Sequence, residues 1–285
     1  MTSCVRMISL FVAAALFSGC ASAPTKPSAP PPVPRDAATA AAIEVALAGA
    51  HRSDANRARD GSRHPLDTLL FFGIKPDMTV VEAWPGAGGW YTEILAPLLA
   101  VNGKLIAAPM PPAPGNEFVT SGLKAFGDKL AARPDLYGKV AVTALGPGVD
   151  AIAPPGSVDM VVTFRNVHNW MNLGFAPEAF AAMFKALKPG GILGVVDHRG
   201  NPDKPQDPRA ANGYVNEAYA IELIKAAGFE FVASSEINAN PRDTKDYAQG
   251  VWTLPPDYRL GNRERAKYEA IGESDRFTLK FRKPR

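Results

Sequence analysis

Strand-like and helix-like segments alternate along most of this chain, and this alternation limits the possible folds more than any other feature. Short apolar runs predict strands, and amphipathic stretches between them predict helices. The strands are expected at 79–83, 104–108, 140–144, 160–164, 192–197, 229–235 and 277–281. The helices are expected at 65–72, 90–99, 117–132, 177–187 and 217–227. The pattern predicts an α/β fold with a doubly wound, seven-stranded, mostly parallel sheet and helices on both faces. Only a loop separates the last two strands, so the last strand is expected to run antiparallel.

The first residues predict an export signal. Arg6 precedes the apolar run "ISLFVAAALF", and small residues lead to Cys20. An apolar run of about ten residues is too short to cross a bilayer. Residues 1–19 resemble a bacterial lipoprotein signal, which implies a lipid on Cys20. The alternative is ordinary cleavage after "ASA", which would leave Pro24 unfavourably at the new terminus.

Residues 20–35 are rich in Pro and Ala and predict an extended tether. The folded domain, with an N-terminal helical extension, is therefore expected at 36–285, and Asp36 is the expected N-cap of its first helix. Ala21, rather than an Asp, follows the cysteine, so no signal for inner-membrane retention is present. The expected location is the cell envelope, at the periplasmic face of the outer membrane.

Charge and cysteine content exclude some classes of function. The chain has 31 Lys and Arg against 28 Asp and Glu, and its longest basic run is the terminal "KFRKPR", so no nucleic-acid partner is expected. The two cysteines are Cys4 and Cys20, both outside the expected domain. A thiol nucleophile and a cysteine metal site are therefore not expected in the domain.

A glycine-rich turn follows the first predicted strand, in "VVEAWPGAG". Glycines at such a turn let the backbone approach a ligand, and the helix that follows favours a polar or anionic group. A dinucleotide-binding fingerprint would require a third glycine where this chain has Tyr91, and a P-loop would require a following Lys-Ser or Lys-Thr. What remains is an acid followed by two glycines: Glu82, Gly86 and Gly88.

These residues, with three further motifs, resemble the class I S-adenosylmethionine-dependent methyltransferases. The further motifs are "GKLIAA", "GSVDMVVTFRNVHNW" and "ALKPGGILGVVDHR", in the expected order. Segments such as "FRNVHNWM" and "IGESDRFTLKF" resemble more closely a group of exported or lipoprotein-type predicted methyltransferases. The resemblance implies a Rossmann-like sheet, S-adenosylmethionine as the cofactor, and a small-molecule acceptor.

The resemblance also implies a cofactor site. Glu82 and the backbone of Gly86 and Gly88 would face the methionine portion of the cofactor, with Trp84 and Asn166 beside them. Two features depart from the family. Trp84 stands where most members have the first glycine, and Ala108 followed by a proline stands where they carry an acid for the ribose hydroxyls.

Polar residues cluster after the fourth and fifth predicted strands, whose carboxyl ends share one edge of the sheet. Methyl transfer needs an aligned acceptor and, when the acceptor carries a proton, a base. The candidate catalytic residues are His168, His198 and Asp197, and the candidate substrate-binding residues are Arg165, Trp170, Arg199 and Tyr214. Alternatively, the histidines are structural hydrogen-bonding groups, and Asp197 and Arg199 pair across a loop. No closely spaced histidine pair is present, so no metal is expected.

Other charged and aromatic segments have structural interpretations. The "GESDR" run at 272–276 is either a charged turn or part of the substrate side. Arg57, Asp60 and Arg63 have the spacing of one helix face, which favours a solvated face of salt bridges over a site. The pair Phe71 and Phe72 is expected in the core.

Two functions from different classes remain open. The first is a methyltransferase anchored in the cell envelope. The second is a non-catalytic envelope binding protein that keeps the same fold, because S-adenosylmethionine is made in the cytosol. Trp84 and the missing ribose acid favour the second function, whereas the glycine turn and the polar strand ends favour the first.

Overall fold

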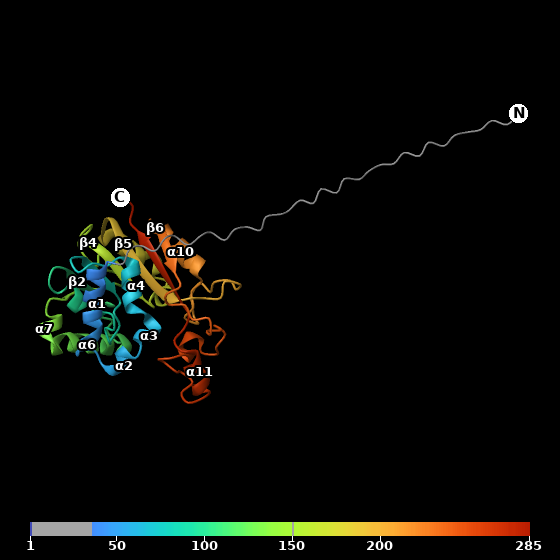
Figure 1. The fold of residues 1–285 in the computed structure, drawn as a ribbon, viewed down its shortest axis with the longest axis horizontal. Coiled ribbons are helices and arrows are strands. Elements are labelled where there is room, and N and C mark those ends of the chain that lie inside the picture. The colour runs from blue at the N-terminus through green and yellow to red at the C-terminus, as the bar shows by residue number, and fades with distance from the viewer. Residues whose placement is uncertain (2–35, 150) are drawn as a thin grey trace. The chain divides into compact units, whose positions relative to one another are not determined.

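The computed structural model describes residues 1, 36–149 and 151–285 (Figure 1). The predictions of an export signal, a tether and lipidation at Cys20 lie outside these residues. Asp36 caps the first described helix by accepting a hydrogen bond from the Thr39 N–H. No helix within the described ranges has both the length and the apolar character needed to cross a membrane.

The strands form one seven-stranded sheet in the order β3-β2-β1-β4-β5-β7-β6. Their bounds are β1 Thr79–Ala83, β2 Lys104–Ala108, β3 Ala141–Val142, β4 Val158–Phe164, β5 Leu187–His198, β6 Glu230–Ser235 and β7 Arg276–Arg282. The first five strands run parallel, and β7 is antiparallel to both β5 and β6. This confirms the predicted doubly wound sheet and its antiparallel last strand.

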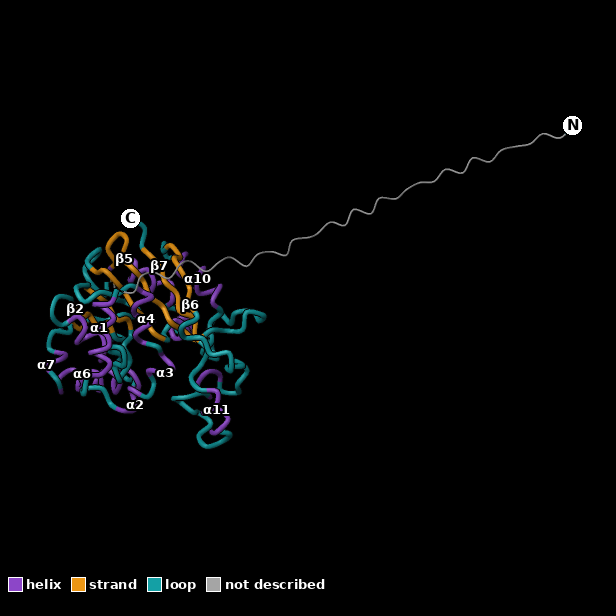
Figure 2. The backbone as a smooth tube through the Cα atoms, viewed as in Figure 1, coloured by secondary structure: helices purple, strands orange, loops and turns teal. Residues whose placement is uncertain are grey.

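The helices precede the first strand or lie in the connections between strands (Figure 2). Their bounds are α1 Ala37–Ala48, α2 Asp54–Arg57, α3 Asp60–Arg63, α4 Pro65–Phe72, α5 Thr92–Leu99, α6 Glu117–Ala132, α7 Pro134–Tyr137, α8 Val167–Asn172, α9 Ala176–Ala186, α10 Glu217–Ala226 and α11 Arg265–Ile271. A short 3₁₀ helix spans Gly250–Thr253. Most of the chain between β6 and β7 is loop (Figure 2).

Neighbouring residues of each central strand point to opposite faces of the sheet, and each face carries its own core. Val81 belongs to a cluster with the apolar residues of α8, α9 and α10. Val80 belongs to a second cluster with those of α1, α4 and α5. A strand buried on both faces is mostly apolar, which is why apolar residues dominate β1 and β4, with Glu82 and Thr163 as buried polar exceptions.

Two strands differ most from their predicted bounds. The edge strand expected at 140–144 pairs with β2 only at Ala141 and Val142. The strand expected to begin at 192 begins at Leu187, because Leu187 pairs with Val158 across a register shift. The segment "LKPGG" therefore belongs to β5 rather than to the preceding loop.

Candidate active site

The carboxyl ends of β1, β4 and β5 lie side by side, since these three strands are parallel neighbours. The start of β7 lies at the same edge, because Arg276 pairs with His198 in the antiparallel register. Residues from the glycine turn, from α8 and from the segment before β7 are thus brought to one edge of the sheet. This is the edge at which open α/β sheets bind ligands.

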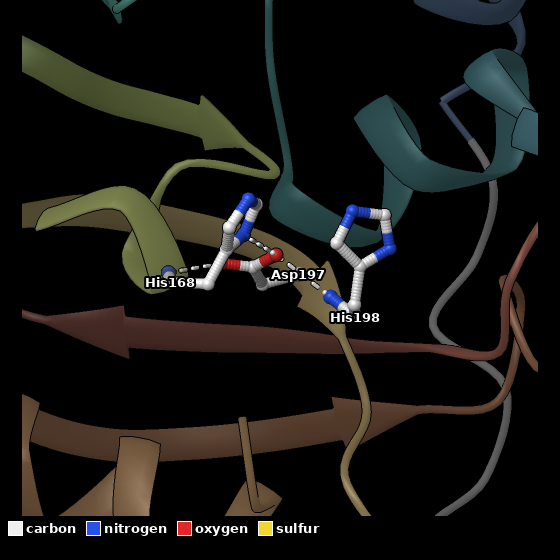
Figure 3. A group of neighbouring side chains, drawn as sticks. All are labelled: His168, Asp197 and His198. Atoms are coloured by element: carbon white, nitrogen blue, oxygen red, sulfur yellow. Dashed lines mark hydrogen bonds and ion pairs between the residues drawn. The ribbon is translucent and has the colours of Figure 1, made fainter. Parts of the chain in front are cut away.

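His168 and Asp197 form a buried pair at this edge (Figure 3). The Nδ1 of His168 lies 2.9 Å from Oδ1 of Asp197, and the His168 backbone N–H donates to Oδ2 at 3.0 Å. The Asp197 side chain is fully buried, and His168 is 4% exposed. An ionised carboxylate only accepts hydrogen bonds, so Nδ1 carries the proton and Nε2 keeps its lone pair when the ring is neutral.

His198 lies beside this pair, with the two imidazole centroids 5.1 Å apart (Figure 3). Its backbone N–H donates to Oδ1 of Asp197 at 2.7 Å, and its Nδ1 lies 2.5 Å from Oγ of Ser274. Burial lowers the pKa of His198 well below its ordinary value, and the neighbouring charges of His168 and Arg165 lower it further. His198 is therefore neutral at pH 7.

The same three residues are the one group in the described ranges whose His and Asp atoms are close enough to hold a metal ion, within 4.8 Å of one another. Asp197 already accepts hydrogen bonds from His168 Nδ1 and from the backbone N–H groups of His168 and His198. Because both carboxylate oxygens are engaged, the geometry favours an Asp–His pair over a cation site.

The glycine turn is open on its outer side. Gly86 and Gly88 are exposed, and a Cβ added at either position would meet no atom within 4 Å. Gly86 has φ +72, which favours glycine, whereas Gly88 has no such requirement. Nothing in the packing of the protein therefore requires a glycine at 88, and the space above the turn is available to a ligand.

Glu82 lies beneath the turn and is 1% exposed. Its Oε2 accepts a hydrogen bond from Oγ1 of Thr92 at 2.7 Å. Burial raises the pKa of Glu82 to about 7, although the Thr92 hydrogen bond and the charge of Lys129 both lower it. The carboxyl is thus partly protonated near neutral pH and is held to the start of α5.

Trp84 lies at the end of β1 and forms hydrogen bonds to the end of β2 and to Leu145. Its Nε1 donates to the Leu145 carbonyl at 2.7 Å, and its backbone N–H donates to the Ala108 carbonyl at 3.0 Å. The Pro109 carbonyl accepts from the Leu145 N–H at 2.8 Å. The end of β2 therefore offers neither an acidic side chain nor an unengaged carbonyl at Ala108 or Pro109.

Two of the predicted site residues, Asn166 and Trp170, form contacts within the protein that hold the fold together. Asn166 donates from Nδ2 to the carbonyls of Ala83 and Trp84, both at 3.1 Å, and so ties the end of β4 to the end of β1. Trp170 is fully buried, against Trp84 and Phe180, rather than forming a wall of the site. Residues two apart on a helix point to opposite sides, so a helix that directs His168 to the site directs Trp170 into the core.

Arg199 and Tyr214 are also bonded within the protein. Arg199 pairs with Glu236 at 2.7 Å and with Glu217 at 3.1 Å, and it does not pair with Asp197. The Tyr214 hydroxyl donates to Asp243 at 3.0 Å, while its ring lies 6.3 Å from that of His198. Tyr214 therefore borders the histidines through its ring and not through its hydroxyl.

The Arg57–Arg63 segment is not one solvated helix face. It is divided between α2 and α3, and Arg63 is 2% exposed and paired with Glu273. The "GESDR" run is likewise buried, with Glu273 8% and Arg276 3% exposed. The two segments meet because β7 inserts between β5 and β6, a long-range contact that helical spacing does not reveal.

Several further residues lie at this edge, and apart from Ser274, which belongs to the "GESDR" run, no motif in the sequence marks them. Ser274 bonds to His198, and the Trp252 ring lies 6.1 Å from that of His168. Tyr91 stacks on Phe164 with ring centroids 3.4 Å apart. Tyr91 directly follows the glycine turn and Phe164 ends β4, so position alone was the available signal for both.

Comparisons with known proteins identify the fold through structure rather than sequence. No protein-family model matches the chain, and no curated protein matches its sequence. Among solved structures, the geranyl diphosphate C-methyltransferase of Streptomyces coelicolor A3(2), in complex with Mg²⁺, geranyl diphosphate and S-adenosyl-L-homocysteine, has a TM-score of 0.53 at 14% identity. The match covers 84% of this chain and 87% of that one.

Two further solved structures match over most of this chain. The [4+2]-cyclase SpnF has a TM-score of 0.53 at 16% identity, covering 83% of this chain and 85% of its own. The Haemonchus contortus phosphoethanolamine N-methyltransferase 2, in complex with S-adenosyl-L-methionine, has a TM-score of 0.50 at 14% identity. This match covers 78% of this chain and 53% of that one. The chain therefore has the Rossmann-like fold of the class I S-adenosylmethionine-dependent methyltransferases.

Proposed function

We propose that this protein is an S-adenosylmethionine-dependent methyltransferase that acts on a small-molecule acceptor. The observation that carries the proposal is one arrangement at one edge of the sheet. An open glycine turn follows β1, and a buried Asp–His pair follows the neighbouring strands β4 and β5. Two structural neighbours named as methyltransferases of geranyl diphosphate and of phosphoethanolamine support a small acceptor.

The residues at the turn fit the amino-acid end of this cofactor. Gly86 and Gly88 leave space above the backbone, and Glu82 lies buried below them. The fit is poorer at the adenosine end, because the carbonyls of Ala108 and Pro109 are already engaged. A ribose hydroxyl left without an acceptor weakens binding by about 1–3 kcal/mol, or about ten- to a hundredfold.

When bound, S-adenosylmethionine supplies a methyl group on a positively charged sulfur. His168 would take the acceptor's proton on Nε2, the nitrogen that Asp197 leaves unprotonated. Asp197 holds the ring in this orientation and stabilises the imidazolium that forms. The rings of His198 and Trp252 lie beside the base, the ring of Tyr214 lies beside that of His198, and together these rings would limit the access of water.

Calorimetric titration of S-adenosylmethionine and S-adenosylhomocysteine into the purified protein tests this proposal. We expect binding in the micromolar range, weakened at least tenfold by Gly88→Leu, whose side chain enters the open space without a packing clash. Gly127→Leu is the matched control, because Gly127 is an exposed glycine of α6 with equally free space around it. Equal binding by both variants would contradict the placement at the turn.

A second candidate function is a binding protein that keeps this fold without catalysis. The hydrogen-bonded Trp84 and the engaged carbonyls of Ala108 and Pro109 favour it. This candidate requires that S-adenosylmethionine does not bind even at millimolar concentration. The same titration therefore separates the two functions.

We also propose that the protein is attached to the periplasmic face of the outer membrane by a lipid on Cys20, as an exported lipoprotein. The basis is the sequence: a short apolar run ends at the cysteine, and a Pro- and Ala-rich stretch follows. Mass spectrometry of the mature N-terminus and fractionation of cells test this. We expect a lipidated cysteine at the membrane and loss of membrane attachment in Cys20→Ser, whereas an unchanged distribution would contradict the anchor.

A further inference from the structure

Four arginines gather beside the histidines, around one buried carboxylate. Glu273 accepts from Nε of Arg59 at 2.7 Å, from Nε of Arg63 at 3.3 Å and from Nη1 of Arg276 at 3.0 Å. Arg165, at the end of β4, lines the same cavity as Arg63 and Arg276. We call Arg59, Arg63, Arg165 and Arg276 the arginine cluster.

The charge of the cluster is not balanced. Four guanidinium groups face a single carboxylate, which leaves three positive charges. Within the described part of the chain, the side chain of Arg165 forms no ion pair and no hydrogen bond. Burial raises the pKa of Glu273, but the arginines outweigh burial and lower it to about 2, so the one carboxylate is ionised. The net charge of three given above already counts the negative charge of Glu273.

Several N–H groups of the cluster are buried without an acceptor. They are Nη2 of Arg59, Nη2 of Arg63 and Nε of Arg276. Arg63 is 2% exposed and Arg276 is 3% exposed, so bulk solvent barely reaches these two side chains. Buried polar groups in folded proteins nearly always have partners, so this concentration of unsatisfied donors indicates a missing acceptor.

The lowered pKa of Arg63 also indicates that an anion is missing from the cluster. Burial and, to a smaller extent, the charge of Arg165 lower its pKa to about 8, against the opposite effect of Glu273. A guanidinium stays protonated in proteins, so the lowered pKa reflects how unfavourable its charge is at this position. An anion among the arginines would remove that penalty.

The arginines enclose a cavity rather than a packed interior. It has a volume of about 10 Å³, which holds one water-sized group, and is lined by Arg63, Tyr91, Phe164, Arg165, Val196, Asn238 and Arg276. The lining combines three arginines with one amide and three apolar or aromatic residues. One oxygen atom of a carboxylate or phosphate group is of the size that this cavity holds.

The backbone at Arg165 is held in an unusual conformation that points its side chain to this place. Its φ is +64, in the left-handed region that residues with a Cβ seldom adopt. The Arg165 N–H donates to the Val196 carbonyl at 2.7 Å and fixes the bend. Strain of this kind persists mainly where the position of a side chain matters for function.

We propose that the arginine cluster binds the carboxylate or phosphate group of a small ligand. Guanidinium groups recognise both through paired N–H donors. Because Ser274, the hydrogen-bond partner of His198, lies between Glu273 and Arg276 in the chain, the bound anion lies next to the histidines. Calling the ligand the methyl acceptor rests on the proposed function, but binding of the anion does not.

Thermal denaturation of the purified protein at constant ionic strength tests this inference, with acetate, inorganic phosphate and neutral acetamide as probes. We expect acetate or phosphate, but not acetamide, to raise Tm in a saturable manner. The anion that saturates at the lower concentration distinguishes a carboxylate from a phosphate ligand. No cofactor is added, so a failure of S-adenosylmethionine binding leaves this result intact.

Arg165→Asn is the informative variant, because asparagine tolerates the left-handed conformation and removes one charge. We expect its Tm without anion to equal or exceed that of the unaltered protein, and its affinity for the anion to fall at least tenfold. Arg282→Gln, which removes an exposed arginine of the same strand as Arg276, is the matched control and keeps the response. The inference is overturned if neither anion is more effective than chloride, if Arg165→Asn responds as the control does, or if this variant is less stable without anion.

Discussion

At the level of single residues, most polar side chains of this site already form hydrogen bonds or ion pairs within the protein, and Asp197 is the clearest case. It accepts three hydrogen bonds from His168 and His198, while Asn166, Arg199 and Tyr214 each bond to other parts of the protein. The groups that remain available to a ligand are the far nitrogen of His168, the glycine turn and the arginine cluster. These three features, rather than the whole polar inventory, define the chemistry of the site.

The tautomer of His168 is the first prediction at this scale. Because Nδ1 donates to Asp197, we expect ¹⁵N NMR of the imidazole to show a protonated Nδ1 and an unprotonated Nε2 when the ring is neutral. Asp197→Asn should abolish this preference, and the ring of His51, which bonds elsewhere, should be unchanged. A protonated Nε2 in the unaltered protein would rule out His168 as the base.

Glu82 gives a pH-dependent prediction. Burial raises its pKa from 4.5 to about 7, so between these values the native protein binds more protons than the unfolded chain. The stability contributed by protonated Glu82 is therefore present below about pH 4.5 and is lost as the pH rises to 7, for a total of about 3 kcal/mol.

Urea denaturation of Glu82→Gln at pH 5 and at pH 8 measures this effect. Glutamine keeps an acceptor for Thr92 and stays neutral, so the free energy of unfolding of the variant relative to that of the unaltered protein should rise by about 2.5 kcal/mol between these pH values. The comparison removes the contribution of His198, which is common to both proteins. A difference that does not change with pH would show that Glu82 titrates normally.

At the scale of elements, short connections after the strands decide what faces the site. Helix α8 is only one and a half turns long, yet it directs His168 to Asp197 and Trp170 into the core. Helix α4 packs against β5 through Phe72, whose ring occupies the space above Gly194. The fit between α4 and β5 thus depends on a large residue opposite a residue without a side chain.

A double-mutant cycle tests this contact. A Cβ at Gly194 would lie 2.5 Å from the Phe72 ring, so Gly194→Ala should destabilise the protein by about 1–3 kcal/mol. Phe72→Ala should destabilise it by about 3–5 kcal/mol, whereas Phe118→Ala, at a residue 76% exposed, should change stability by less than about 0.5 kcal/mol. The double variant should be more stable than the sum by about 1 kcal/mol or more, and strict additivity would contradict the contact.

At the scale of the whole molecule, the sheet was predictable and the arginine cluster was not. The strands read clearly from local pattern, because β1 and β4 are buried on both faces. Helix α8 was missed because six residues give too little periodicity. The ion pair between Arg59 and Glu273 joins residues 214 positions apart, and no local spacing indicates such a contact.

The pairing of His168 with Asp197 was predictable for a topological reason. His168 follows β4 and Asp197 lies at the end of the parallel neighbour β5, so the order of the strands brings them together. Trp170, in contrast, was assigned to the site by its place in the sequence, and only the phase of α8 assigns it to the core. The order of the strands decides which strand ends lie close together, whereas local backbone geometry decides the direction in which each side chain points.

A crystal structure of the protein with saturating S-adenosylhomocysteine tests the central claim most directly. We expect this ligand at the turn, with its amino-acid end against the backbone of Gly86 and Gly88, at the edge of the sheet that carries His168. An unoccupied turn, or the ligand bound elsewhere, would contradict a methyltransferase and leave a binding protein that keeps this fold.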